Sequence, residues 1–381
     1  MSNISRLTSL AAAGAGSVDP IEGVQQAVFS GPSNNSDFGR KVAISADGNT
    51  GVTAANAAIY TYTRSGDAWT LESTLSITCA DVALTDDGNM MAVGQPAGYD
   101  GVRVYTRSGG TWTQQAQFTR VGKIDNEAVG STVEFNEDGT TLVIGCPNYL
   151  RDSRGGGVLI YVRSGTTWSQ QTFFASPIST DSGEFGMYGL GVSKDGNVFV
   201  IGHAEVYTNT GRVFVYTRTG TSWARTADIS ANTTSQKWFG FSADISDDGN
   251  TIAIGSRNEN SQFGAAYLYT LSGGTWTQQQ RIAGPSQGEF GYSVALSGDA
   301  STLIVGAQSE VSSTQKGAAY IYRSDNNTSW GLVTRIVGSN TTTNHTFGAS
   351  LDLSRDGSTA VIGAPGYYAA YNLLGWTYFF V

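Results

Sequence analysis

The residues of this sequence that could do chemistry are, first of all, carboxylates that recur in similar short segments. Aspartates occur in SADGN, SDDGN, SRDGS and related stretches, at Asp47, Asp87, Asp138, Asp195, Asp248, Asp299 and Asp356. A pair of carboxylates is the machinery of glycoside hydrolysis. That reaction needs one asymmetric pair, whereas a residue required by turn geometry is repeated in every unit. We therefore interpret these aspartates as structural.

Other reactive groups are few. The two histidines, His203 and His345, share no spacing with each other or with cysteine, so they form no zinc pattern, and we expect solvated or core histidines. Cys79 and Cys146 stand in apolar stretches and are expected to be small buried residues rather than a disulfide or a reactive thiol. No G-x-S-x-G, Walker or H-E-x-x-H motif occurs. The sequence predicts no enzyme, no cofactor and no metal site.

Tryptophans and arginines also recur, on either side of a Gly-containing turn. Segments such as RSGGTWTQQ place tryptophans at Trp69, Trp112, Trp168, Trp223, Trp276 and Trp330, and arginines at Arg64, Arg107, Arg163, Arg218 and Arg323. Because they repeat, we interpret the tryptophans as packing residues rather than sugar-stacking platforms. For the arginines, pairing or solvation is the ordinary interpretation, and a charged docking ring is the alternative.

These residues are positioned by a repeat. The spacing of the turn aspartates runs from 40 residues (Asp47 to Asp87) to 57 (Asp138 to Asp195) and defines seven units. Each unit holds an alternating segment such as SVALS, an apolar run such as TIAIG (251–255), a segment such as GAAYLY, and a segment that opens with Trp. The Asp-Gly pair supplies the positive φ of a tight hairpin between the first two segments. Four antiparallel strands repeated seven times predict an all-β, seven-bladed β-propeller.

The two ends of the chain favour a closed ring over a linear solenoid. The last unit stops after its third segment, GWTYFFV (375–381), whereas VQQAVFSG (24–31) near the beginning resembles the fourth segment WTQQAQFT (112–119). We therefore expect residues 24–30 to form the outer strand of the last blade and to pair with the C-terminal strand. This divides the chain into an N-terminal arm (1–23) and a propeller domain (24–381).

Charge and composition exclude some partners. The chain of 381 residues has a formal net charge of −9 and no basic cluster, so we expect no nucleic-acid partner. No apolar run approaches the length of about 18 to 20 residues that spans a membrane. The segment SNISRLTSLAAAGAGS has only a faint likeness to a signal peptide and is treated as part of the arm.

The pattern FG-x-x-(V/L)-x-(V/L)-S-x-DG followed by (V/I)-G-A-P resembles the FG-GAP repeat of integrin α-subunit propellers and their bacterial and viral relatives. Its best matches are Phe347-Gly348 with Gly363-Ala364-Pro365, and Val129-Gly130 with Gly145-Cys146-Pro147. The resemblance covers about residues 24–381 and implies the propeller fold. The Asp-rich calcium loop of integrin-like repeats is cut short here, so calcium binding is not implied.

The N-terminal SRLTSLAAAGAG is similar to the openings of virion proteins of tailed phages that infect marine bacteria. This resemblance implies a non-enzymatic virion structural protein, on the tail or the capsid surface, within a larger symmetric and extracellular assembly. Its partners would be other virion or surface proteins and a host-surface glycan or receptor. The alternative is a secreted bacterial adhesin or polysaccharide-binding propeller.

Recognition is expected on one face of the ring. The Asp-Gly turns are short and uniform and define the Asp-Gly face, whereas the loops between second and third strands and the blade crossovers vary and define the variable face. The candidate binding residues on the variable face are Tyr149, Arg151, Tyr207, Trp238, Arg257, Tyr367, Tyr368 and Tyr371, with Leu373 and Leu374 beside the last three. In the arm, Ile4, Leu7 and Leu10 would face inward from a short helix that docks on the particle; a disordered tail is the alternative.

Overall fold

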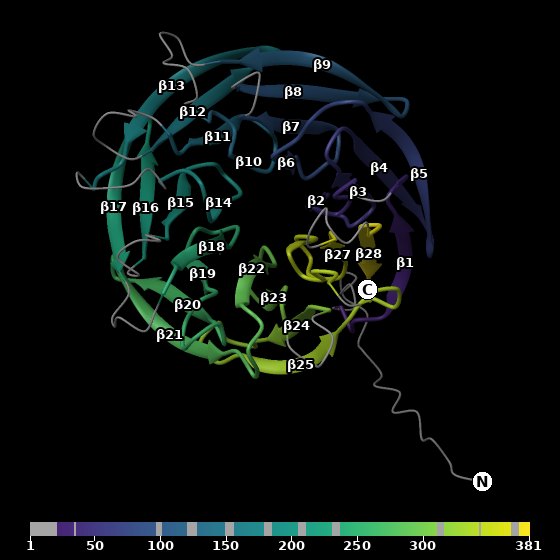
Figure 1. The fold of residues 1–381 in the computed structure, drawn as a ribbon. Helices are drawn as coiled ribbons and strands as arrows, with labels where there is room; N and C mark the ends of the chain where they lie inside the picture. The colour runs from purple at the N-terminus through teal and green to yellow at the C-terminus, as the bar shows by residue number, and fades with distance from the viewer. Residues whose placement is uncertain are drawn as a thin grey trace, which may run out of the picture.

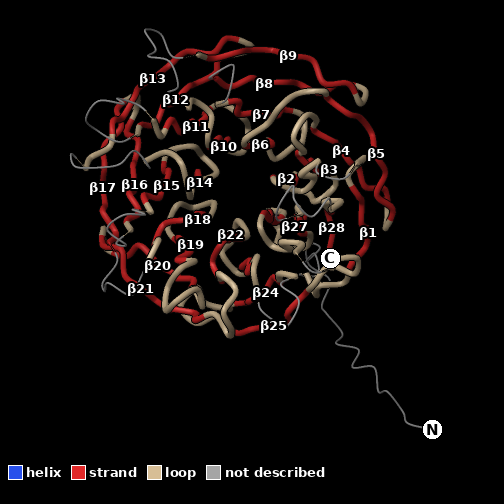
Figure 2. Tube along the Cα trace, in the orientation of Figure 1, coloured by secondary structure: helices blue, strands red, loops and turns tan. Residues whose placement is uncertain are grey.

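The computed structural model describes residues 21–33, 36–96, 101–119, 128–148, 156–178, 185–204, 211–230, 237–310, 316–342, 344–366 and 373–381. These residues form seven four-stranded antiparallel sheets arranged radially around a central axis (Figure 1). Figure 2 shows strands and loops and no helix among the described residues. The predicted all-β propeller with seven blades is confirmed.

In each blade the strands are given from the axis outward. Blades 1 to 4 are β2 (Lys41–Ile44), β3 (Thr50–Ala54), β4 (Ile59–Ser65) and β5 (Ala68–Leu75); β6 (Asp81–Leu84), β7 (Met90–Gln95), β8 (Gly101–Ser108) and β9 (Thr111–Phe118); β10 (Thr132–Phe135), β11 (Thr141–Cys146), β12 (Gly157–Ser164) and β13 (Thr167–Ala175); β14 (Leu190–Val192), β15 (Val198–His203), β16 (Arg212–Thr219) and β17 (Ser222–Ser230). Blades 5 to 7 are β18 (Phe239–Ile245), β19 (Thr251–Ser256), β20 (Ala265–Ser272) and β21 (Thr275–Ala283); β22 (Phe290–Leu296), β23 (Thr302–Ala307), β24 (Ala318–Arg323) and β25 (Gly331–Ile336); β26 (Ser350–Leu353), β27 (Ala360–Ala364), β28 (Trp376–Phe380) and β1 (Gln25–Ser30).

The last blade is completed by the beginning of the chain. Strand β1 pairs antiparallel with β28, with Val28 opposite Tyr378 and Ser30 opposite Trp376. The C-terminal strand therefore lies between β27 and β1, and the predicted closure of the ring by its own ends is confirmed (Figure 1). Ile21, the first described residue, is fully buried in the core between blades 6 and 7.

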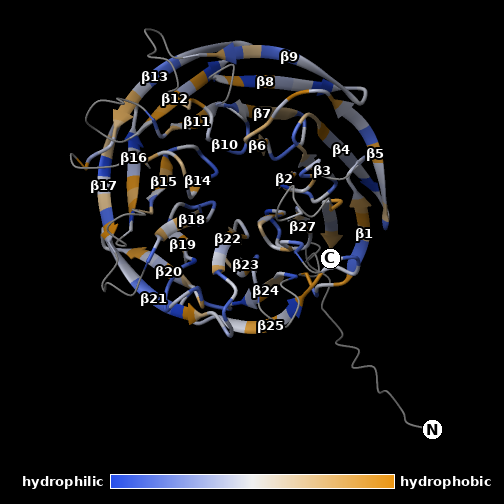
Figure 3. Ribbon diagram, in the orientation of Figure 1, coloured by the Kyte–Doolittle hydropathy of each residue, from blue (hydrophilic) through white to orange (hydrophobic). Residues whose placement is uncertain are grey.

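Apolar residues are buried between neighbouring blades. Second strands such as β19 and β23 are buried along their whole length, as expected for strands covered on both faces. The buried apolar side chains of the described residues form seven clusters, each joining two adjacent blades. Figure 3 shows the outermost strands as a mixture of hydrophilic and hydrophobic residues. The blades therefore stabilise one another rather than folding around separate cores.

The FG and GAP segments meet where two blades come closest. In blade 5, a Cβ atom added to Gly255 would lie 2.0 Å from the carbonyl oxygen of Gly291, the FG glycine of blade 6. Gly363 stands in the same relation to Gly39, at 1.9 Å, across the junction of blades 7 and 1. Phe290, the FG phenylalanine that precedes Gly291, is fully buried between blades 5 and 6. The repeat motif is therefore a requirement of inter-blade packing, because backbone atoms occupy the space of a side chain.

The turn aspartates are structural, as predicted. The Oδ1 atom of Asp248 accepts hydrogen bonds from the Ser246 hydroxyl (2.6 Å) and the Asn250 backbone N–H (2.9 Å). Gly249 follows with a φ of 70°, which a glycine adopts without strain. Partial burial raises the pKa of Asp248, but these hydrogen bonds outweigh it, so that its pKa is lowered overall.

The recurring tryptophans and arginines also join neighbouring blades. Trp69 stacks on Phe379 of the last blade, with ring centroids 3.8 Å apart. Arg107 of blade 2 forms an ion pair of 2.9 Å with Glu72 of blade 1 and lies over the ring of Trp112. Arg163 donates to the carbonyl oxygens of Asp138 and Gly139 instead. The tryptophans are confirmed as packing residues; Arg107 links two blades, Arg163 supports the Asp-Gly turn of its own blade, and neither arginine pairs with another arginine of the set.

Candidate functional site: the axial cavity and its mouth

A cavity of about 820 Å³ lies on the axis of the ring. Residues from all seven innermost strands line it: β2, β6, β10, β14, β18, β22 and β26. Each of these strands pairs with a neighbour on one side only, so its other edge faces the axis. Backbone N–H and C=O groups on such an edge are available to side chains or to a ligand.

The Asp-Gly turns lie at one end of the cavity, where Ala46, Asp86 and Arg355 line it. Each Asp-Gly turn bonds to the next through its backbone, in the order Ala46, Asp86, Glu137, Lys194, Asp247, Gly298 and Arg355, with N···O distances of 2.8 to 3.3 Å. These residues all directly precede the turn aspartates. These six hydrogen bonds join the turns of the seven blades into an open ring at this end.

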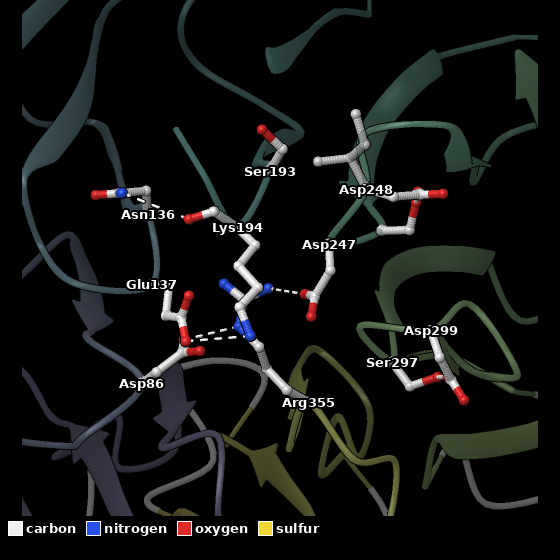
Figure 4. Close-up of polar contacts among 12 residues, drawn as sticks. Asp86, Asn136, Glu137, Ser193, Lys194, Asp247, Asp248, Ser297, Asp299 and Arg355 are labelled. Carbon is white, nitrogen blue, oxygen red and sulfur yellow. Dashed lines mark hydrogen bonds and ion pairs between the residues drawn. The ribbon is translucent and has the colours of Figure 1, made fainter. Parts of the chain in front are cut away.

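Arg355 spans the centre of this ring. Its Nε atom lies 2.7 Å from Oδ1 of Asp86 in blade 2, and its Nη1 atom binds Asp247 in blade 5 (Figure 4). Lys194 forms a further ion pair of 3.1 Å with Glu137. Burial raises the pKa of Asp86 more than Arg355 lowers it. Together these side chains form a charged floor across the cavity.

Three carboxylates that share one strand position, Asp352, Asp244 and Glu134, lie in the wall above the floor. Asp352 accepts hydrogen bonds from the backbone N–H of Leu353 (2.8 Å) and, in blade 1, of Ile44 (2.9 Å). Burial outweighs these bonds and raises the pKa of Asp352 to about 7.

Asp244 and Glu134 occupy the same strand position in blades 5 and 3. Asp244 accepts from the backbone N–H of Leu296 in blade 6 at 2.7 Å, and burial raises its pKa to about 6. Burial, reinforced by the charges of Asp352 and Asp244, raises the pKa of Glu134 well above its usual value. Asp352 and Asp244 therefore connect the edges of neighbouring blades, and all three carboxylates hold protons more tightly than exposed acids do.

The opposite end, at the variable face, is the mouth. One residue per blade lies there, seven positions before the turn aspartate of its blade: Arg40, Ala80, Ser131, Tyr188, Phe241, Tyr292 and Ala349. Tyr188, Phe241 and Tyr292 follow one another around the ring, with centroids 4.6 Å and 4.9 Å apart. The mouth therefore has an aromatic side over blades 4 to 6, whereas the other blades contribute Arg40 and the small residues Ala80, Ser131 and Ala349.

Two predicted binding residues meet at this aromatic side. The guanidinium carbon of Arg257 lies 4.0 Å from the ring centroid of Trp238, 4.2 Å from that of Phe241 and 5.1 Å from that of Tyr292. Its Nη1 atom pairs with Glu289 at 3.1 Å, and Gln308 donates to the same carboxylate at 2.6 Å. Arg257 is thus held between aromatic faces, an arrangement that favours a cation.

The other predicted binding residues lie outside the part of the chain that the structure describes. These are Tyr149, Arg151, Tyr207, Tyr367, Tyr368 and Tyr371, and the same holds for Ile4, Leu7 and Leu10 of the arm.

The two histidines and two cysteines are buried. The backbone N–H of Thr342 donates to Nδ1 of His345 (2.9 Å), so Nε2 carries the proton and donates to the Leu374 carbonyl oxygen (2.9 Å). His345 and His203 are both buried, so they are core histidines. Cys79 and Cys146 are buried free thiols, as expected.

The floor, the wall carboxylates and Arg355 were missed by reasoning from the sequence. The sequence feature that could have revealed them is variation within an otherwise uniform turn. The residue directly before the turn aspartate changes between Ala, Asp, Glu, Lys, Gly and Arg from blade to blade. Among the described residues, no cluster of three or more histidine, cysteine, aspartate or glutamate side chains is arranged to hold a metal ion. Nor does that part of the chain contain a helix long and apolar enough to cross a membrane.

Comparison with known proteins supports the repeat and the fold. Residues 276–322 match the model of the FG-GAP repeat, from the outer strand of blade 5 through the third strand of blade 6. No curated protein matches the chain. A chain of Kuenenia stuttgartiensis hydrazine synthase is similar in structure, with a TM-score of 0.61 and 13% identity over 91% of this chain and 96% of that one. A chain of the mitotic checkpoint complex has a TM-score of 0.63 and 14% identity over 100% and 99%. At these identities the likeness shows the propeller fold alone.

Proposed function

We propose that the chain is a non-enzymatic structural propeller of a tailed-phage particle, attached through its N-terminal arm and presenting its variable face to a host-surface or virion partner. The single observation that carries this proposal is that Ile21, the first described residue, is bonded at the Asp-Gly face. The backbone N–H of Ile21 bonds to the carbonyl oxygen of Gly357 at 3.0 Å, in the Asp-Gly turn of blade 7. The guanidinium of Arg323 donates to the carbonyl oxygen of Ile21.

The arm therefore joins the ring at the Asp-Gly face, on the side opposite the variable loops. An attachment segment on one face and recognition loops on the other suit a protein that is fixed to a particle and binds outward. The Asp-Gly face is also the more regular one, since its turns are bonded to one another around the axis.

The charged groups of the axial cavity support a role without catalysis. Asp352 and Asp244 each use both carboxylate oxygens to bind backbone N–H groups, and Arg355 is held by two aspartates. Groups committed in this way stabilise the ring. A general acid and base, by contrast, must have free atoms aimed at a substrate.

The alternative, a secreted adhesin or polysaccharide-binding propeller, would use the same variable face without a particle. The arm separates the two functions. Deleting residues 2–20 keeps Ile21 and its bonds, so we expect unchanged folding but loss of the chain from assembled particles. The measurements are circular dichroism, a urea unfolding midpoint, and immunoblotting of purified particles.

A matched substitution tests the other face. Trp238→Ala, with the arm intact, should leave incorporation unchanged and weaken adsorption of the particles to host cells. Normal incorporation of the chain without residues 2–20 would refute attachment through the arm, whereas absence of the full-length chain from purified particles would overturn the virion proposal and favour the secreted adhesin.

A further inference from the structure

We propose that the axial cavity is a binding pocket for the terminal sugar of a glycan, in neutral or amino form, which enters through the mouth at the variable face. This inference rests on the proposed function in one respect: it takes the variable face as the recognition face. It specifies the axial cavity as the binding site, a terminal sugar as the ligand, and a preference for neutral or amino sugars over acidic ones.

The shape of the cavity fits an end group. Its volume of about 820 Å³ lies within the range of roughly 300–1,000 Å³ of small-molecule sites. Arg355 bridges Asp86 and Asp247 at the end on the Asp-Gly face, so charged side chains lie across that end (Figure 4). We therefore expect the last one or two units of a branch to enter from the opposite end.

The chemistry of the wall fits a ligand rich in hydroxyl groups. Seven strand edges face the axis, and their backbone donors and acceptors alternate along the cavity. Polar side chains, among them Ser131, Lys41, Asp81 and Gln308, add to them. An apolar peptide side chain would leave these groups without partners, at a cost in free energy that hydroxyl groups avoid.

The mouth offers the apolar surface that sugar rings need. Tyr188, Phe241 and Tyr292 form one side of it, and a sugar has a C–H face that packs on aromatic rings. Arg257 lies against Phe241 and Tyr292 and is itself fixed by Glu289, so these rings are held in place before a ligand arrives. The small residues Ala80, Ser131 and Ala349 leave room on the other side.

Charge sets the selectivity. Each cation that lines the cavity is already paired with a carboxylate: Arg40 with Asp37, Lys41 with Asp81, Arg257 with Glu289, and Arg355 with Asp86 and Asp247. A sulfated or uronic sugar would therefore bring its charge into a partly buried site without an unpaired cation to receive it, which costs free energy. A neutral hexose avoids that cost, and the wall carboxylates can accept hydrogen bonds from an amino sugar.

The mouth can be blocked by a side chain that the same repeat position already carries in other blades. Ala349 occupies the position that carries Tyr188, Phe241 and Tyr292 in blades 4 to 6, so the ring geometry already accepts an aromatic residue there. Ala349→Tyr, and Ser131→Tyr as a second blocking variant, should fill the open side. Leu71→Tyr adds the same group to the outer strand β5, where Leu71 is 51% exposed, and serves as the control.

The test measures binding of the full-length chain by saturation-transfer NMR and calorimetry at millimolar ligand. The probes are galactose, glucosamine, N-acetylglucosamine, chitobiose and glucuronic acid. We expect at least one neutral or amino sugar to bind, about tenfold weaker binding by both blocking variants, unchanged binding by Leu71→Tyr, and about tenfold weaker binding of glucuronic acid.

Three results would overturn the inference: no sugar binds, a sugar binds equally well to the blocked variants, or glucuronic acid binds best. Cross-linking of a partner protein to the mouth without sugar binding would also overturn it, in favour of a protein ligand. None of these outcomes affects the arm-deletion experiment, which tests the proposed function separately. Conversely, a full-length chain that is absent from particles but binds sugar at the mouth would refute the virion role and support this pocket.

Discussion

The Oδ2 atom of Asp352 in the last blade accepts a hydrogen bond of 2.9 Å from the backbone N–H of Ile44 in the first blade. The junction of first and last blades is therefore secured at the axis as well as at the rim, where β1 pairs with β28. Asp244 makes the corresponding bond to Leu296 between blades 5 and 6. Buried carboxylates at the axis thus serve to join neighbouring blades, and this leads to the first prediction.

Stability should fall as the pH rises through the weakly acidic range. The pKa values of Asp244 (about 6) and Asp352 (about 7) are raised by burial above the unfolded value of about 3.9, so the folded state holds more protons between these values. The free energy of unfolding should therefore decrease from about pH 4 to about pH 7. The turn aspartates, whose pKa values are lowered, act oppositely below about pH 4.

Urea unfolding midpoints at a series of pH values would show a maximum near pH 4 to 5. The double variant Asp244→Asn/Asp352→Asn should flatten the decline above that maximum, because amides do not titrate. A midpoint that rises steadily from pH 4 to pH 8 in the unmodified chain would contradict this assignment.

Loss of Arg355 should destabilise the ring more than loss of the other cation of the floor. Arg355→Met leaves Asp86 and Asp247 without their shared partner, at a cost of about 1–3 kcal/mol. Lys194→Met removes a cation from the equivalent turn position, but that ion pair is exposed, at 46% and 41%, and should cost less than about 1 kcal/mol. Equal unfolding midpoints for the two variants would argue against Arg355 as a bridge.

Ring closure depends on Phe379, whose fully buried side chain lies between the last and first blades. It stacks on Trp69 and contacts Tyr62 and Phe29 edge to face. Phe379→Ala should lower the free energy of unfolding by about 3–5 kcal/mol. The control Leu71→Ala, at a position 51% exposed, should change it by less than about 0.5 kcal/mol. Denaturant unfolding followed by tryptophan fluorescence measures both, and similar small losses would refute the packing role.

The inter-blade glycine contact predicts that one methyl group can be disruptive. Gly255→Ala places a Cβ atom 2.0 Å from the carbonyl oxygen of Gly291, so the blades must separate, at a cost of about 3 kcal/mol or more. Gly331→Ala, on outer strand β25, meets no atom within 4 Å and should be nearly neutral. Thermal unfolding of the two variants compares them directly. If Gly255→Ala unfolds at the same temperature as Gly331→Ala, the glycine contact does not limit blade spacing.

Much of the architecture could be predicted because local physics repeats along the chain. The Asp-Gly turns, the apolar second strands and the outer tryptophans each follow from residue types at fixed spacing, and the displaced strand at residues 25–30 follows from counting segments at the two ends. Trp238 and Arg257 were both expected on the variable face, and the structure brings them into contact. That contact joins a crossover to a loop of the same blade, which places both residues at the same end of the blade.

The repeat, the number of blades and the structural turn residues could be predicted because they depend on neighbours along the chain, and the closure of the ring followed from the missing fourth segment of the last unit. The contents of the axis became apparent only in the folded protein. The ion pairs at the axis join three separate blades: Arg355 lies in blade 7, Asp86 in blade 2 and Asp247 in blade 5. No pattern along the chain predicts that these three side chains meet. Side chains at one strand position converge on the axis only when seven separate sheets are arranged around it, so the cavity, its charged floor and its aromatic mouth are properties of the closed ring.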